Sequence, residues 1–283
     1  MQTVHENPMR LLGSPIRLFA NISQALSVFF NRVSRLLEGL VPAVLPPSQL
    51  NALTRESYVD YYSKVSTKED LPQKGDELEQ WETQVFNTHH VDAGRMLVLG
   101  SGLGRESLAI AQRGVTVVGV DTNDLAVRTA VQFAGRMGAR AHFSIASFLE
   151  LPFASASFDF VLLTDVMYSA IPDASARQTW LTGLRHVLKP NGLVILSFEA
   201  EREPASRLTP ICGRLNAMLV KLPGANKAYQ RGDAYAYGHF IHFFQDEREI
   251  RNELLDAHVA IQELSWDHGY AVVRHIPSIH PSS

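Results

Sequence analysis

Three glycines and one acid are the residues of this chain whose types and spacing are best suited to binding a nucleoside. Gly100, Gly102 and Gly104 stand in the segment GSGLG, directly after the short apolar run Met96–Leu99. Glycines let the backbone approach a ligand closely and adopt φ values that a Cβ disfavours. Asp121 ends the next apolar run, where a carboxylate can accept hydrogen bonds from a ribose diol. The spacing therefore predicts a nucleoside-binding βαβ unit.

The elements that must position these residues follow from the hydrophobic pattern. Short apolar runs between turn residues are typical of central parallel strands that are covered on both faces. Beyond Asp121 the pattern predicts a helix, two strands, a helix, a fifth strand, a helix and a terminal hairpin. Their ranges are 124–138, 139–145, 158–163, 172–188, 193–198, 246–257 and 258–273. Residues 77–89 are predicted to form the helix that leads into the first strand.

Two classes of ligand compete for a glycine turn of this kind. Dinucleotide-binding folds use G-x-G-x-x-G, which needs a small residue at position 105, and the long side chain of Arg105 would crowd a pyrophosphate. The pattern G-x-G-x-G with an acid ending the second strand resembles instead the first motif of class I S-adenosylmethionine-dependent methyltransferases. A Rossmann-like turn without a ligand is the third interpretation.

The resemblance to this family covers roughly residues 77–275. Phe158 and Asp159 open the fourth strand as in the family, and LKPNG at 188–192 resembles the family's tight turn into the fifth. The implied fold is α/β, with a Rossmann-like doubly wound seven-stranded sheet, a C-terminal antiparallel hairpin and an α-helical N-terminal extension. Val98 and Ser147 depart from the family, because an acid often occupies each of these two positions.

The resemblance also implies a cofactor, S-adenosyl-L-methionine, and no metal ion. The expected cofactor-binding residues are Gly100, Ser101, Gly102, Gly104, Asp121, Thr122, Ser147, Phe148 and Asp165. Ligands of doubly wound sheets lie beyond the carboxyl ends of the strands, so the segment after the fourth strand should face the methyl group. The candidates for a catalytic role on the substrate side are Tyr168, His239 and His242. A histidine there could act as a general base or serve only in packing.

Composition and pattern divide the chain into four segments. We expect an amphipathic helical extension at 1–50, a lid helix and linker at 51–76, the methyltransferase domain at 77–275 and a flexible tail at 276–283. The domain should carry a substrate roof inserted at 200–244. Tyr58, Tyr61 and Tyr62 in the second segment either close a lid over the cofactor or serve in packing.

The apolar positions of residues 15–45 form a helical stripe, with Arg17, Arg32 and Arg35 off it. Polar residues interrupt the stripe, so no run approaches the roughly 20 apolar residues of a membrane span. The helix packs on the domain or on a second subunit of a homodimer, or it rests on a membrane surface through residues 10–45. Both alternatives stay open from the sequence.

The formal net charge of −3 argues against a nucleic-acid partner. A single cysteine rules out an intramolecular disulfide and is simplest to reconcile with a reducing cytoplasm, with or without peripheral membrane contact. We therefore expect methyl transfer to an O or N atom of a small, hydrophobic or lipid-like acceptor. The alternatives are a non-catalytic cofactor-binding or scaffold domain, a tRNA-modifying methyltransferase and, more weakly supported, a nicotinamide-dependent reductase.

Overall fold

The computed structural model describes residues 8–65, 78–163, 165–202, 209–236 and 238–276. Its large sheet consists of β1 (Arg95–Leu99), β2 (Thr116–Asp121), β3 (Ala141–Ile145), β4 (Phe158–Leu163), β5 (Leu188–Ser197), β8 (Val259–Ser265) and β9 (Tyr270–His275). The helices around it are α4 (Gln80–Thr88), α5 (Arg105–Gln112), α6 (Asp124–Met137), α7 (Ala174–Gly183) and α9 (Glu247–Asp256). Outside this body lie α1 (Pro8–Val44), α2 (Pro47–Val65), α8 (Thr209–Leu219), β6 (Asp233–Ala236) and β7 (His239–His242).

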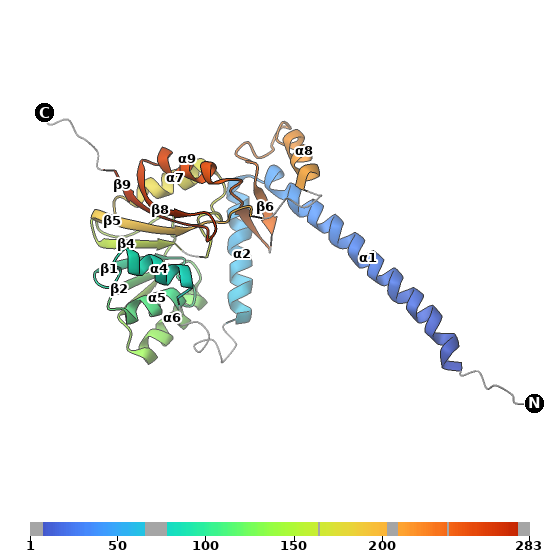
Figure 1. The fold of residues 1–283 in the computed structure, drawn as a ribbon, viewed down its shortest axis with the longest axis horizontal. Coiled ribbons are helices and arrows are strands. Elements are labelled where there is room, and N and C mark those ends of the chain that lie inside the picture. Colours follow the sequence, from blue (N-terminus) through green and yellow to red (C-terminus); the bar gives the residue numbers. More distant parts are fainter. Residues whose placement is uncertain (1–7, 66–77, 164, 203–208, 237, 277–283) are drawn as a thin grey trace, which may run out of the picture.

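The strands of the large sheet lie in the order β3-β2-β1-β4-β5-β9-β8 (Figure 1). Strands β1 to β5 are parallel, whereas β9 pairs antiparallel with both β5 and β8. The chain runs outward from β1 to β3 and then crosses to β4 on the other side of β1. This reversal is the switch point at which open α/β sheets bind ligands. The sheet order and the terminal hairpin confirm the predicted fold class.

Two hydrophobic layers hold the sheet between its helices. Leu97 and Leu99 of β1 point into the layer beneath α7 and α9, whereas Met96 and Val98 point into the layer beneath α4, α5 and α6. This alternation is the two-residue period of a strand that is buried on both faces. Val98, which stands where an acid was expected, is completely buried in the second layer.

Three local expectations differ from the structure. Helix α7 ends at Gly183 rather than at 188, and Leu188–Gly192 already belongs to β5 instead of forming a turn. Leu188 pairs with Phe158, and the register then shifts before Leu193 pairs with Phe160, which makes this stretch an irregular strand start. Residues 223–238, whose glycines and polar residues are typical of a loop, contain β6, because β7 supplies it with backbone partners. The part of the expected lid helix and linker that follows residue 65 lies outside the described residues.

Helix α1 projects away from the body, and only its C-terminal end is attached (Figure 1). The side chain of Asn216 on α8 donates a hydrogen bond to the carbonyl of Gly39 at 2.8 Å, and that of Asn226 donates to the carbonyl of Pro42 at 2.8 Å. The backbone amide of Asn226 also donates to the carbonyl of Ala43 at 3.0 Å. Residues 21–34 are exposed throughout. Across the parts of the chain that the structure describes, none of the helices is both long and apolar enough to cross a membrane.

Helix α2 stands beside the carboxyl ends of the parallel strands, and strand β7 contacts it (Figure 1). The backbone amide of Phe240 donates a hydrogen bond to the Thr54 hydroxyl at 3.1 Å. The ring of His239 stacks on that of Tyr58, with centroids 5.5 Å apart. The inserted β6–β7 hairpin therefore fixes α2 in place over the edge of the sheet.

Candidate cofactor site

A pocket of about 540 Å³ lies between α2 and the carboxyl ends of the parallel strands. Pockets of this size hold small molecules and cofactors. The lining residues are Ser48, Asn51, Ala52, Thr54, Arg55, Tyr58 and Tyr62 of α2, Gly100, Val120, Asp121 and Thr122 at the ends of β1 and β2, Ile145 to Leu149 around the end of β3, and Asp165, Met167 and Ala170 after β4. The pocket therefore occupies the switch point of the sheet.

Asp121 is the anchor of this pocket. One carboxylate oxygen accepts a hydrogen bond from the backbone amide of Gly102 at 2.9 Å, and the other accepts from that of Asn123 at 2.8 Å. Burial raises the pKa of Asp121, and these backbone hydrogen bonds act in the opposite direction. Each oxygen keeps further lone-pair capacity, so the carboxylate can also accept from a diol placed in the pocket.

The glycine turn lies directly before α5, and Tyr62 covers it. Gly102 has a φ of +49°, and a Cβ built on it would lie 2.5 Å from the Tyr62 hydroxyl oxygen. Gly104 has a φ of +93°, and a Cβ there would lie 3.0 Å from the ring of Phe143. Gly102 thus gives Tyr62 its place above the turn, whereas Gly104 lets α5 pack closely on β3.

The phenol groups of Tyr58 and Tyr62 on α2 remain protonated at neutral pH. Burial raises the pKa of Tyr58 to about 12, and the carboxylates of Asp165 and Asp121 add to the shift. Burial also raises the pKa of Tyr62 well above its ordinary value, with a further contribution from Asp121. Both hydroxyls are therefore hydrogen-bond donors to a ligand and are unsuited to be general bases.

The segment after β3 forms one wall of the pocket. The Ser147 hydroxyl accepts a hydrogen bond from the backbone amide of Leu149 at 3.2 Å. The backbone carbonyl of Phe148 accepts from the Trp180 indole at 2.8 Å, which fixes the segment on α7. The half-buried Phe148 ring packs edge-on against Trp180 and also lines the pocket. An aromatic face at this place can pack against a purine.

Asp165 follows β4 and lines the pocket from a strained backbone. Asp165 and Val166 have φ values of 53° and 52°, a region that β-branched residues such as valine rarely adopt. The backbone amide of Val166 donates to the Ser197 hydroxyl at 2.9 Å, which supports this conformation. Strained backbone of this kind clusters at functional sites.

The pocket brings together six of the nine residues expected to bind the cofactor, and the other three lie in the turn beneath it. The six are Gly100, Asp121, Thr122, Ser147, Phe148 and Asp165. Of the other three, Gly102 contacts Tyr62, Gly104 packs on Phe143, and Ser101 is buried. The Ser101 hydroxyl oxygen has no hydrogen-bond partner among the described residues.

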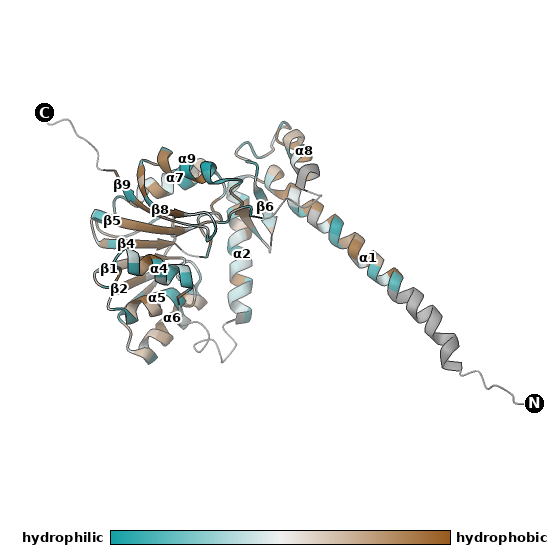
Figure 2. Cartoon of the chain, in the orientation of Figure 1, coloured by the Kyte–Doolittle hydropathy of each residue, from teal (hydrophilic) through white to brown (hydrophobic). Residues whose placement is uncertain are grey.

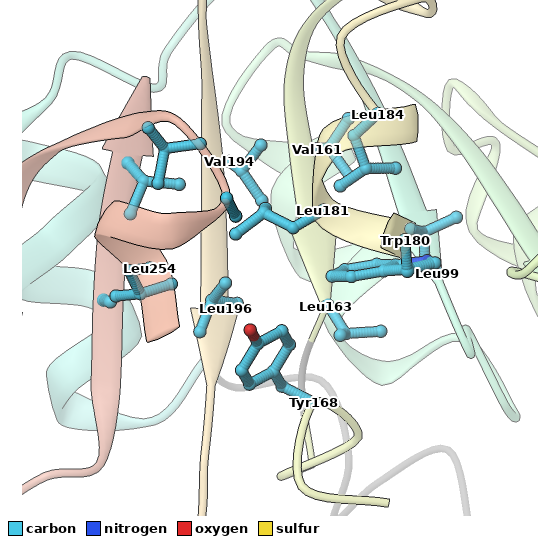
Figure 3. Packing of buried hydrophobic residues seen from close by; sticks show 14 of the residues in the cluster. Leu99, Val161, Leu163, Tyr168, Trp180, Leu181, Leu184, Val194, Leu196 and Leu254 are labelled. Atoms are coloured by element: carbon cyan, nitrogen blue, oxygen red, sulfur yellow. The ribbon is translucent and has the colours of Figure 1, made fainter. Parts of the chain in front are cut away.

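Tyr168 does not face this pocket. Its side chain is completely buried in the hydrophobic layer between the sheet and α7, beside Leu163, Trp180 and Leu196 (Figure 3). Its ring stacks against that of Phe244 with centroids 6.2 Å apart. The chain turns after β4 and carries the Tyr168 side chain into the core, so the structure does not bring it together with the lining residues of the pocket.

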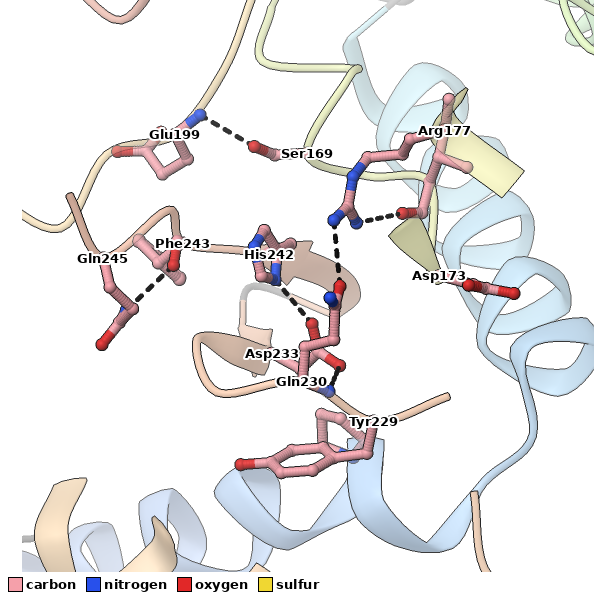
Figure 4. A network of polar contacts seen from close by, with 12 residues as sticks. Ser169, Asp173, Arg177, Glu199, Tyr229, Gln230, Asp233, His242, Phe243 and Gln245 are labelled. Atoms are coloured by element: carbon pink, nitrogen blue, oxygen red, sulfur yellow. Dashed lines mark hydrogen bonds and ion pairs between the residues drawn. The ribbon is translucent and has the colours of Figure 1, made fainter. Parts of the chain in front are cut away.

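His242 is also placed away from the pocket, in a buried polar network (Figure 4). Its Nδ1 atom lies 2.7 Å from Asp233, and its Nε2 atom lies 3.4 Å from Glu249. These neighbours hold the His242 ring at the end of the β6–β7 hairpin, and it does not line the pocket. His239 is half-buried and stacks on Tyr58 without lining the pocket itself.

The network gives a testable dependence of stability on pH. Burial alone would lower the pKa of His242, but its hydrogen bonds to Asp233 and Glu249 outweigh that effect and raise it. Because the pKa of His242 is higher in the folded protein than in the unfolded chain, protonation of this ring stabilises the fold at pH values below the ordinary histidine pKa of about 6.5. This stabilisation is lost as the pH rises from that value through the pKa that His242 has in the folded protein. The free energy of unfolding, measured with urea at several pH values, should therefore fall above about pH 6.5.

The control for this dependence is the exposed His142. We expect His242→Gln to flatten the decrease, whereas His142→Gln should leave it unchanged. An unchanged decrease in the His242 variant would show that its neighbours do not favour the protonated ring.

The pattern of tyrosines on α2 could have revealed several lining residues that the sequence analysis did not name. Asn51, Arg55, Tyr58 and Tyr62 are spaced by four, three and four residues, so they share one face of the helix. Once the two tyrosines are assigned to a lid, Asn51 and Arg55 follow. Met167 and Ala170 had no such signal, because they lie in irregular chain after β4.

Arg105, which argued against a dinucleotide, is directed to α4. Its guanidinium pairs with the buried Glu82 at 3.1 Å and also contacts Glu106. In the described part of the chain, no group of three His, Cys, Asp or Glu side chains is arranged to hold a metal ion.

Known proteins resemble this chain both in sequence pattern and in fold. Residues 96–192 match the model of a family described as a methyltransferase domain. An S-adenosylmethionine-dependent methyltransferase from Methanosarcina mazei is 22% identical, covers 67% of this chain and 97% of its own, and superposes with a TM-score of 0.51. No curated protein matches the sequence significantly.

Two further structures have the same fold. A 1,6-didemethyltoxoflavin-N1-methyltransferase from Burkholderia thailandensis, solved with its substrate and S-adenosylhomocysteine, is 18% identical, with 81% of this chain and 88% of that one covered and a TM-score of 0.55. An S-adenosylmethionine-dependent methyltransferase from Clostridium acetobutylicum is 11% identical, with 76% and 98% covered and a TM-score of 0.52. Residues 96–192 thus match a methyltransferase domain model, and the chain has the fold of class I S-adenosylmethionine-dependent methyltransferases.

Proposed function

We propose that this protein is an S-adenosylmethionine-dependent methyltransferase that acts on a small, hydrophobic or lipid-like acceptor. The observation that carries the proposal is the pocket at the switch point, with the Asp121 carboxylate held at its floor by the Gly102 and Asn123 amides. The Methanosarcina mazei and Burkholderia thailandensis methyltransferases have the same overall fold.

The residues of the pocket fit the parts of the cofactor. Asp121 has the acceptor capacity for the ribose hydroxyls, and Phe148 offers a ring face to the adenine. Asp165 lies at the end of β4, where the methionine end would be. When bound, the sulfonium supplies an activated methyl group for an in-line displacement.

The protein's share of the reaction is then mainly positioning. It has to hold the acceptor atom near attack distance and exclude water, and α2 closes the pocket on the side away from the sheet. Tyr58 can donate a hydrogen bond to the acceptor, because its pKa of about 12 keeps the hydroxyl protonated. Asp165 is the lining carboxylate best placed to take a proton from an O or N acceptor.

The character of the acceptor follows from the other lining groups. The rings of Tyr58, Tyr62 and Phe148 and the side chain of Met167 present apolar surface. Arg55, at the α2 side, adds one cation that could meet an acidic group on an otherwise apolar molecule. These features support a hydrophobic small molecule as the acceptor.

Calorimetric titration with S-adenosylhomocysteine tests the proposal. We expect saturation at one site per chain and no displacement by NAD, because Arg105 and the G-x-G-x-G turn do not suit a dinucleotide. No heat of binding from S-adenosylhomocysteine, with the protein shown to be folded by circular dichroism, would refute the proposal.

A non-catalytic cofactor-binding domain is the second candidate. The observation in its favour is that Tyr168 and His242, two of the three candidates for a catalytic role, are buried outside the pocket. Single-turnover transfer from methyl-labelled S-adenosylmethionine to mixed apolar phenols, amines and carboxylic acids separates the two. Binding of the cofactor without transfer to any of these classes would favour the second candidate.

A further inference from the structure

The free part of α1 carries a continuous apolar stripe. Its members are Ile22, Leu26, Phe29, Phe30, Val33 and Leu37. Their spacing of three and four residues places them on one side of the helix, and Gln24, Ser27 and Asn31 lie opposite. Phe29 and Phe30 are 59% and 64% exposed, although aromatic rings of this size are usually covered. Figure 2 shows apolar and polar residues alternating along this part of the helix.

The same helix concentrates positive charge in an acidic protein. Residues 8–37 contain four arginines, at positions 10, 17, 32 and 35, and no aspartate or glutamate. The whole chain has a formal net charge of −3, so the rest of it is more acidic than that value. A basic helix with an apolar stripe complements an anionic, partly apolar surface.

The structure and the sequence of α1 argue against two other partners for the apolar stripe, the domain itself and a second copy of the chain. The domain contacts α1 only near its C-terminal end, through α8 and β6, and leaves residues 21–34 exposed. A second copy pairing as a coiled coil would use a narrow seam flanked by opposite charges. Here Phe30 and Leu37 widen the stripe, and Glu38, near the attached end, is the one acid that α1 has beside its four arginines.

We propose that α1 binds the surface of an anionic lipid membrane, lying in the interface with its apolar stripe toward the acyl chains. Phe29 and Phe30 enter the boundary between headgroups and acyl chains, and Arg32 contacts lipid phosphates. The acidic body is held off the surface at the attached end of the helix. Asn216 and Asn226 fix that end, so the body keeps a defined orientation on the membrane.

Vesicle sedimentation with the full chain tests this proposal. The probes are vesicles of phosphatidylcholine alone and vesicles in which part of it is replaced by phosphatidylglycerol. We expect binding to the anionic vesicles that weakens with added salt and is much weaker on neutral ones. Phe29→Ser with Phe30→Ser should reduce the affinity at least about tenfold, and Arg32→Gln about fivefold.

The matched control is Leu255→Ser, which removes an apolar side chain that is 55% exposed on α9 of the body. This variant should bind vesicles as well as the unaltered chain does. All variants should bind S-adenosylhomocysteine equally, so a failure of the membrane proposal can be told apart from a failure of the proposed methyltransferase function. Unchanged vesicle binding in the paired phenylalanine variant would overturn the proposal. The proposal would also be overturned if light scattering showed a dimer that this variant dissociates, and if anionic vesicles bound neither the variant nor the unaltered chain.

Discussion

Asp121→Ala should lower the affinity for S-adenosylhomocysteine by at least about 100-fold, because it removes the carboxylate that we propose to accept hydrogen bonds from the ribose hydroxyls. Hydrogen bonds to a charged group contribute roughly 1.5–3 kcal/mol each, and two of them would be lost. The substitution also leaves the amides of Gly102 and Asn123 without their acceptor, so the turn itself loosens. Calorimetric titration of the variant beside the unaltered protein measures the loss.

Asp124→Ala is the control for this prediction. Asp124 lies three residues farther along the chain, is exposed, and pairs with Arg128 at the surface. Its removal should leave the affinity unchanged. Asp121→Asn should fall between the two, since the amide keeps one acceptor oxygen and the shape of the side chain. Equal affinities in the Asp121→Ala and Asp124→Ala variants would show that the pocket binds no ribose at β2.

Arg177→Met should lower the free energy of unfolding by about 3–5 kcal/mol, because it leaves a buried carboxylate without its partner. Arg177 is completely buried, and its Nε and Nη2 atoms each donate to an oxygen of Glu253 at 2.7 Å. It also donates to the carbonyl of Ile171 and the side chain of Gln230, both at 3.0 Å (Figure 4). Urea denaturation followed by circular dichroism measures the change.

Two further variants decide whether the pairing is the cause. Arg177→Met combined with Glu253→Leu should recover most of the stability, because an apolar pair of similar volume can replace a buried ion pair. Arg251→Met breaks the exposed contact with Glu247 and should change the free energy by less than about 0.5 kcal/mol. A single Arg177 variant as stable as the unaltered protein would contradict the network described here.

The strands of the sheet could be predicted because each one is indicated by residues that are neighbours in the sequence. Each central strand is a short apolar run that ends at a turn, as Met96–Leu99 does before the glycines. The acid at Asp121 was predictable for the same reason, since it directly follows such a run. Where one strand or one turn decides the position of a residue, the pattern is sufficient.

The direction of Tyr168 and the role of His242 could not be predicted in this way. Tyr168 follows β4 in irregular chain, where no period indicates which side chain faces the core and which faces the pocket. His242 is explained by Asp233, across the hairpin, and by Glu249, on the next helix. Arg177 and Glu253 stand 76 residues apart, and no motif relates them. Contacts of this kind become visible only when the packed chain is known.

The inserted hairpin is attached to both N-terminal helices, and this has a mechanical consequence. Backbone contacts of β7 hold α2 through Thr54, and residues just before β6 hold the end of α1 through Asn226. A displacement of α1 would therefore reach the wall of the pocket without passing through the sheet. The rates at which ligands enter and leave would then differ between a chain whose α1 is free and one whose α1 is held.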